Sequence, residues 1–176
     1  MAKRRPVSPK DPSRLPGTYW TRVFVGGSYR ATPAPVISAL GRKGKAIPRA
    51  LIDHVRDVVT DASLRPVVAA EFKVADPDRD IHHDALYLLH ACRLAIFELS
   101  EFSGALMEIE RAADYGTLCL ILYDDPTGTG WRLSRMLSSF VQEHPERFTL
   151  NGYDGIDSAK LAARNWLAEM RRHRHV

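Results

Sequence analysis

Residues 93–113, RLAIFELSEFSGALMEIERAA, predict a buried strand, a short loop and the start of a helix. Residues 94–97 are all apolar without alternation, which is typical of a parallel strand covered on both faces. Glu98 ends this strand, and residues 100–104 form the expected loop. From Ala105 onward apolar residues recur at helical spacing, so we expect a helix there.

This segment places two acidic side chains beside one turn. Glu98 follows the apolar strand directly, and Glu108 lies in the first turns of the expected helix. In open α/β sheets, ligands bind at the carboxyl ends of the strands. We therefore expect Glu98 and Glu108 to flank a ligand site. The alternative reading of Glu108 is a charge that favours the positive end of the helix dipole.

Strands and helices alternate along the rest of the chain. Further strands are expected at residues 20–25, 67–72, 117–123 and 148–150. Further helices are expected at residues 50–62, 82–91, 132–143 and 156–172. This alternation predicts an α/β fold with a flavodoxin-like (Rossmann-like), doubly wound sheet of five parallel strands.

The length of 176 residues suits one domain with a sizeable core, which we place at residues 18–176. Residues 1–17 form a basic, proline-rich stretch that we expect to be disordered. Residues 31–47, rich in proline, glycine and cations, are expected to form a flexible flap. The net charge of +4 comes mainly from the two ends of the chain, so a nucleic-acid groove is not expected.

Other patterns narrow the class of protein. The sequence has no apolar run of about 18 residues and no secretory signal, so we expect a cytoplasmic protein without a membrane partner. Cys92 and Cys119 lie in apolar surroundings and are expected to be buried, reduced thiols. His82 and His83 are adjacent on a helix and point different ways. No third ligand accompanies them, so we expect neither a metal nor another cofactor.

Polar and glycine residues at two expected strand ends suit an anion. Gly27, Ser28 and Arg30 follow the first strand, where a glycine lets the backbone approach a ligand. Ser103 and Gly104 precede a helix, whose free N–H groups attract anions. The Ser28 hydroxyl and the Arg30 guanidinium suit a phosphate. A flavodoxin-like strand order would bring these two groups to one edge of the sheet.

A carboxylate beside a phosphate pocket suits chemistry at the C1′ carbon of a sugar that loses its base. The oxocarbenium-like transition state is stabilised by a nearby negative charge, and a glutamate can trap the sugar covalently. A second acid can orient the sugar or protonate the leaving base.

Three segments then resemble the nucleoside 2-deoxyribosyltransferase superfamily. They are VFVGGSYR at 23–30, DIHHDALYLLHACRLAIFELSEFSGALMEIERA at 80–112 and GWRLSRML at 130–137. The chain is most similar to the branch of 2′-deoxynucleoside 5′-phosphate N-hydrolases. In order, the segments hold a Gly-Ser-x-Arg turn, an acid in the second helix, a strand ending in an acid, a helix with a glutamate signature and a Leu-Ser-x-Met element. The likeness runs from residue 23 to the last helix.

The resemblance implies roles for three acids and one serine. Glu108 is expected to be the nucleophile at C1′, and Asp84 to orient Glu108 or the sugar hydroxyls. Glu98 matches the acid at the end of the third strand, where a catalytic and a structural role both stay open. Ser134 matches a serine that reaches a phosphate site across a dimer interface, so the resemblance implies a homodimer.

The resemblance also implies that Ser28, Arg30 and Ser103, with Gly27 and Gly104 beside them, line a pocket for a 5′-phosphate. Hydrolysis of a nucleoside 5′-monophosphate is therefore the leading expectation, with a small-molecule nucleotide or nucleoside as substrate.

Three alternatives stay open. They are transfer of the sugar to a second base, cleavage of NAD as in TIR-like enzymes, and binding of a nucleotide or NAD without turnover. Phe24 replaces an aromatic hydroxyl that the hydrolases would have, and Glu110 replaces a glycine. These departures favour the binding module among the alternatives.

Overall fold

The structure is a computed structural model that describes residues 17–27, 47–68, 81–99, 105–125 and 135–173. Five strands form one sheet in the order β2-β1-β3-β4-β5, and every neighbouring pair is parallel. Their bounds are β1 Arg22–Gly26, β2 Arg65–Val68, β3 Leu94–Leu99, β4 Leu118–Asp124 and β5 Phe148–Tyr153. The predicted α/β, doubly wound, five-stranded parallel sheet is confirmed. The change of direction between β1 and β3 is where such sheets bind ligands.

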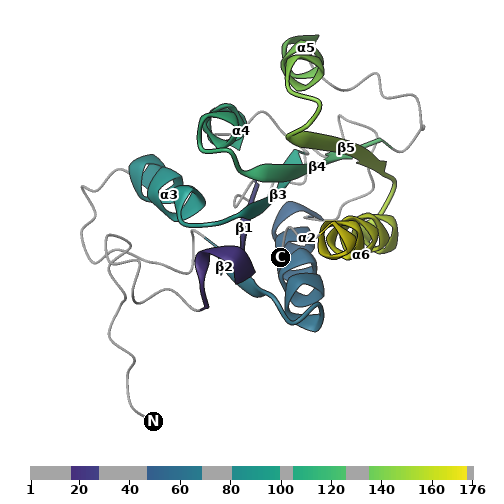
Figure 1. The fold of residues 1–176 in the computed structure, drawn as a ribbon. Helices are drawn as coiled ribbons and strands as arrows, with labels where there is room; N and C mark the ends of the chain where they lie inside the picture. Colours follow the sequence, from purple (N-terminus) through teal and green to yellow (C-terminus); the bar gives the residue numbers. More distant parts are fainter. Residues whose placement is uncertain (1–16, 28–46, 69–80, 100–104, 126–134, 174–176) are drawn as a thin grey trace.

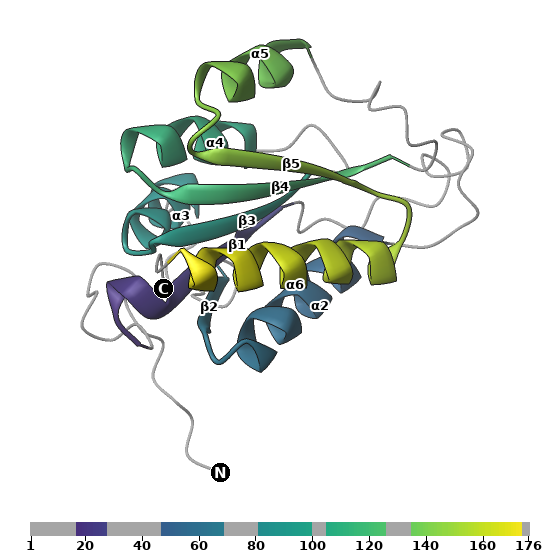
Figure 2. The ribbon, with the colours of Figure 1, turned by 45° about the vertical axis from the view of Figure 1, so that its right-hand side comes forward.

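Helices cover both faces of this sheet. Helices α2 and α6 lie side by side on one face, and α3, α4 and α5 lie on the other (Figures 1 and 2). The bounds are α2 Ile47–Asp61, α3 Ile81–His90, α4 Ala105–Asp114, α5 Arg135–Glu143 and α6 Ile156–Arg172, with a 3-10 turn, η2, at Tyr19–Thr21. We refer to the two faces as the α2/α6 face and the α3/α4/α5 face.

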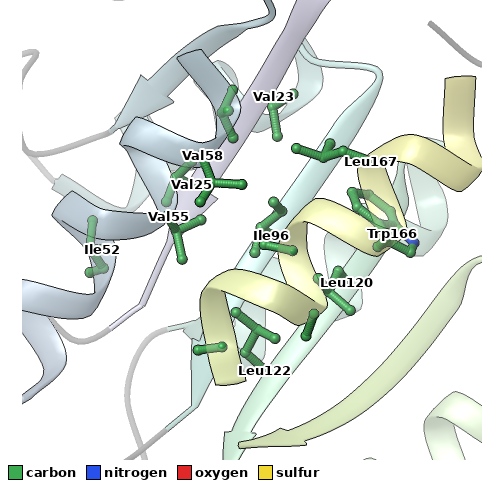
Figure 3. Packing of buried hydrophobic residues seen from close by; sticks show 14 of the residues in the cluster. Val23, Val25, Ile52, Val55, Val58, Ile96, Leu120, Leu122, Trp166 and Leu167 are labelled. Atoms are coloured by element: carbon green, nitrogen blue, oxygen red, sulfur yellow. The ribbon is translucent and has the colours of Figure 1, made fainter. Parts of the chain in front are cut away.

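The core on the α2/α6 face is built from alternate residues of the central strands. Figure 3 shows Val55 and Val58 of α2 and Trp166 of α6 packed over β1, β3 and β4. Leu94 and Ile96 of β3 belong to this cluster, so every second residue of β3 faces α2 and α6.

The intervening residues build the core on the α3/α4/α5 face. Phe24 and Phe97 are fully buried there, with their ring centroids 5.7 Å apart. Cys92 and Cys119 lie in the same cluster as free, buried thiols, as the sequence predicted. Because both faces of these strands are covered by helices, both sets of alternate residues are apolar, and the strands appear in the sequence as unbroken apolar runs.

The largest differences from the sequence-based strand predictions are at one end of β1, β2 and β5. β1 begins at Arg22 because Tyr19–Thr21 forms η2. β2 begins at Arg65 and includes Pro66, which an edge strand tolerates because one side of it needs no backbone donor. β5 continues to Tyr153, since its last residues pair with β4 beyond the predicted end at residue 150.

Gly152 lies in the added part of β5. A Cβ added at this glycine would lie 3.2 Å from the hydroxyl oxygen of Tyr123 and 3.1 Å from Cβ of Asp125. The Asn-Gly pair at 151–152 therefore leaves room for neighbouring side chains within the sheet and does not form a turn. The tail at 1–16, the predicted flap through residue 46 and residues 69–72 lie outside the described residues. Within the described ranges, no helix combines the length and apolar character needed to cross a membrane.

Candidate active site

Buried carboxylates gather at the carboxyl edge of the sheet. Within the described part of the chain, the buried acids are Asp84, Glu98, Glu108, Asp124 and Asp125. Two lie in the first turns of α3 and α4, and the others lie at the ends of β3 and β4. Burying carboxylates is costly unless their surroundings compensate. Their concentration where ligands bind in this fold therefore indicates a functional site.

Glu108 lies against the end of β1. Its side chain is only 9% exposed, and its Oε2 would be 3.0 Å from a Cβ added at Gly26. The same Cβ would lie 2.7 Å from Cε1 of Phe24 and 2.9 Å from Cδ1 of Phe97. The absence of a side chain at Gly26 thus leaves room for the carboxyl group of Glu108 beside two aromatic rings.

These surroundings change the acidity of Glu108. Burial raises the pKa of its carboxyl group to about 7 from an ordinary value of 4.5. The physical cause is desolvation, which penalises the charged form. At neutral pH both the carboxylate and the acid are therefore populated, as suits a group that gains and loses negative charge during a reaction.

Asp84 lies on the same face as Glu108. It is a buried residue in the first turn of α3, which packs directly against α4 (Figure 1). The helices of a parallel α/β sheet run opposite to the strands, so the first turns of α3 and α4 both lie at the carboxyl edge. The structure thus brings Asp84 and Glu108 to neighbouring helix ends, as the predicted roles require.

Glu98 lies on the opposite face. It follows Leu94 and Ile96 in the alternation of β3, and both belong to the α2/α6 core. The hydroxyl of Tyr153, also in that core, donates a 2.6 Å hydrogen bond to Oε1 of Glu98. Glu98 and Glu108 therefore approach the carboxyl edge from opposite faces of the sheet.

Gly27, the residue directly after β1, packs against Glu98 of β3. Its φ of +154° is a conformation that residues with a side chain rarely adopt. A Cβ there would lie 3.0 Å from the carbonyl oxygen of Glu98 and 3.3 Å from Cδ1 of Ile52 in α2. The backbone of Gly27 is therefore packed between β3 and α2, and this packing requires a glycine.

The other predicted anion-binding residues, Ser28, Arg30, Ser103, Gly104 and Ser134, lie outside the described residues. The phosphate pocket thus stays a prediction. The structure describes the residues that precede and follow two of these segments: Gly27 at the end of β1 and Ala105 at the start of α4, both at the carboxyl edge.

The sequence analysis did not place Tyr153, Asp124 or Asp125 in the functional site. Asp124 is the last residue of β4, and its Cα pairs in register with Tyr153 of β5. The N–H of Asp125 donates a 2.7 Å hydrogen bond to the carbonyl oxygen of Tyr153. In the sequence, the two adjacent acids at the end of the apolar run 118–123 indicate that polar groups lie at this part of the carboxyl edge.

Tyr123 is a further polar group at this edge that the sequence analysis did not assign. Burial, with a smaller effect from Asp125, raises the pKa of its hydroxyl.

In the described ranges, no group of three or more His, Cys, Asp or Glu residues is arranged to hold a metal ion.

Comparisons with known proteins give a likeness in fold. No family model matches the chain, and no curated protein matches it. Among solved structures, the CMP N-glycosidase BcmB from Clostridium botulinum is similar, with a TM-score of 0.48 and 14% sequence identity. The match covers 86% of this chain and 98% of that chain. Similarity at this level carries no argument about function, which therefore depends on the residues of the site.

Proposed function

We propose that this protein hydrolyses the N-glycosidic bond of a (deoxy)nucleoside 5′-monophosphate and that Glu108 is the nucleophile. The observation that carries the proposal is the position of Glu108: a buried carboxyl group at the carboxyl edge, next to Gly26 and beside two aromatic rings, with a pKa of about 7. The ordered motifs that resemble the nucleoside 2-deoxyribosyltransferase superfamily support the same assignment.

The reaction has two steps. In the first, the Glu108 carboxylate forms a bond to C1′ while the bond from C1′ to the base nitrogen breaks, and the base leaves with the bonding electrons and takes up a proton from an acid of the site or from solvent. In the second, the oxygen of water forms a bond to C1′ while the bond from C1′ to Glu108 breaks. The water gives up one proton to the group that protonated the base, and the sugar phosphate and the Glu108 carboxylate are released. Phe24 and Phe97 keep the surroundings apolar, which strengthens the attraction between the carboxylate and the positive charge developing on the sugar.

Asp84 is the partner of Glu108 in this proposal. Its place in the first turn of α3, beside α4 and on the same face, lets it orient Glu108 or the sugar hydroxyls. Glu98 has no direct part in the bond exchange at C1′, because it lies on the other face and binds Tyr153.

The phosphate end of the substrate is assigned to the segments that follow Gly27 and precede Ala105. Ser28, Arg30 and Ser103 supply hydroxyl and guanidinium groups there, and the first N–H groups of α4 add a favourable dipole. Ser134 directly precedes α5, and we propose that it acts across a homodimer interface. Sedimentation of the purified protein measures the dimer, and a monomer at assay concentration would contradict this part of the proposal.

The test is a chromatographic screen for free base. The protein is incubated with nucleoside monophosphates, free nucleosides and NAD, in parallel with Glu108→Gln and Glu110→Gln. Glu110 is exposed on the same helix, so Glu110→Gln is the matched control. We expect base release from at least one monophosphate, lost in Glu108→Gln and kept in Glu110→Gln. Equal rates in wild type and Glu108→Gln would contradict the assignment.

The same screen separates the alternatives. Exchange with an added second base identifies a transferase, and release of nicotinamide identifies an NAD-cleaving enzyme. Nucleotide binding without release of any base identifies a binding module.

A further inference from the structure

Tyr153 and Glu98 form a buried pair on the α2/α6 face. Both side chains are 2% exposed, and the hydroxyl of Tyr153 lies 2.6 Å from Oε1 of Glu98. Tyr153 ends β5 whereas Glu98 belongs to β3, so the hydrogen bond spans the intervening strand β4. A short O–H···O bond to a carboxylate is among the stronger hydrogen bonds in proteins. The pair therefore holds the ends of two non-neighbouring strands together.

Glu98 also contacts the end of β1. A Cβ added at Gly27 would lie 3.1 Å from Cβ of Glu98, and on the same side it would meet Ile52 of α2. Gly27 is thus enclosed by Glu98 and α2, in a conformation with positive φ. In the chain, Gly27 immediately precedes Ser28, the first residue assigned to the phosphate.

We infer that Tyr153 is a positioning residue that acts through Glu98 to hold Gly27 in place at the end of β1. Glu98 is then a support for β1 and not an acid that moves a proton in the reaction. The α3/α4/α5 face thus holds Glu108 and Asp84, and the α2/α6 face holds the pair that supports Gly27. This inference rests on the proposed function for its kinetic test.

Tyr153→Phe is the first variant, because it removes only the hydroxyl. We expect the KM for the monophosphate, and the inhibition constant of inorganic phosphate, to rise about tenfold, as for weakening one hydrogen bond to a charged group. We expect kcat to change less than about twofold, because Glu108 and Asp84 lie on the other face. Inhibition by the released free base should stay at the wild-type level.

Tyr115→Phe is the matched control. Tyr115 follows α4 at the opposite edge of the sheet, where its ring contacts His90. This variant should leave the inhibition by phosphate unchanged. An unchanged phosphate inhibition constant in folded Tyr153→Phe, or an equal change in Tyr115→Phe, would overturn the inference.

Glu98→Gln distinguishes a supporting role from a chemical one. The amide oxygen of glutamine still accepts the hydrogen bond from Tyr153, but the amide cannot carry a proton as a carboxyl group does. We expect kcat within about twofold of wild type in Glu98→Gln, and a rise in KM smaller than that of Tyr153→Phe, because the hydrogen bond from Tyr153 is kept but is weaker to a neutral amide. A fall in kcat as large as that of Glu108→Gln would show that Glu98 takes part in the chemistry, and would overturn the inference.

A second measurement needs no activity. The amide signals of Gly27 and Gly116 are compared in nitrogen-15 NMR spectra of wild type and Tyr153→Phe, with Gly116 as the reference at the opposite edge. We expect a clear shift at Gly27 and none at Gly116. If wild type releases no base, the proposed function fails while this measurement still tests the contact, and an unshifted Gly27 signal would overturn the inference by itself.

Discussion

The two faces of the carboxyl edge hold the same residue type in different surroundings. Glu108, on the α3/α4/α5 face, sits against Gly26 and aromatic rings. Glu98, on the α2/α6 face, receives a hydrogen bond from Tyr153. Apolar surroundings keep a carboxyl group able to change its charge near neutral pH, whereas a strong donor fixes its position. Under the proposed function, these different surroundings, and not the residue type, give the two glutamates different roles.

The largest effect expected from this comparison is on turnover. Glu108→Gln should lower kcat for base release by at least about 1,000-fold, since the covalent step loses its nucleophile. Glu98→Gln should leave kcat within about twofold of wild type, because its oxygen still accepts the bond from Tyr153. Steady-state assays of both variants on the same nucleotide measure the contrast. Equal losses in the two variants would remove the distinction between the faces.

The pH dependence of the reaction follows from the same environment. The nucleophile must be ionised, and the pKa of Glu108 is about 7. We expect kcat/KM to rise with pH and to level off above about pH 7, with a fall of about tenfold per unit well below that value. A profile that levels off near the ordinary glutamate pKa of 4.5 would show that Glu108 does not control the rate.

The stability of the fold should change in the opposite direction with pH. The pKa of Glu108 is 4.5 in the unfolded chain and about 7 in the folded protein, so between these values the folded state binds more protons. Stability from this group is therefore complete below pH 4.5 and falls as the pH rises through about 7, by about 3 kcal/mol. Glu108→Gln should be more stable than wild type at pH 8 and should not be at pH 4.

Urea unfolding of the two proteins at both pH values measures this effect. Glu110→Gln is the reference, because the side chain of Glu110 is exposed on the same helix. A Glu108→Gln protein less stable than wild type at pH 8 would mean that the buried carboxylate has stronger partners than its apolar surroundings suggest.

Filling the space beside Glu108 should have a smaller effect. Gly26→Ala places a methyl group within 3.0 Å of Oε2 of Glu108 and closer still to two rings. We expect a loss of about 1–3 kcal/mol in stability from overpacking. We also expect the pH at which kcat/KM levels off to shift, since the carboxyl group must move. Unchanged stability and an unchanged pH profile of kcat/KM would show that the space between Gly26 and the carboxyl group of Glu108 is larger than the structure describes.

Much of the fold follows from local pattern, as does part of the site. The apolar run at 94–97 and the helical spacing from residue 156 to 172 predicted β3 and α6 at their observed positions. The alternation of strands and helices predicted a flavodoxin-like order, which places Gly27 and Glu108 at one edge of the sheet, and the structure has both there. Local pattern suffices for these features because each depends on neighbours in the chain.

The division between the faces could not be predicted in the same way. A strand that is apolar on both sides carries no sign of which side each residue faces, so the orientation of Glu98 depends on packing. Tyr153 lies beyond the predicted end of the fifth strand at residue 150, after an Asn-Gly pair that is typical of a turn. Pairing with β4, distant in the sequence, is what keeps these residues in β5.

The last expected effect, of the same size as that of Gly26→Ala, concerns the stability provided by the Tyr153–Glu98 pair. Tyr153→Phe leaves the buried Glu98 carboxylate with one donor fewer and should cost about 1–3 kcal/mol at pH 7, as measured by urea unfolding. Adding Glu98→Gln should recover part of this loss, because an amide without its donor is less costly to bury than a carboxylate. The double variant thus separates the cost of an unsatisfied charge from the value of the bond. A double variant less stable than Tyr153→Phe would mean that the carboxylate stabilises the end of β1 through other contacts, with the hydroxyl of Tyr153 contributing little.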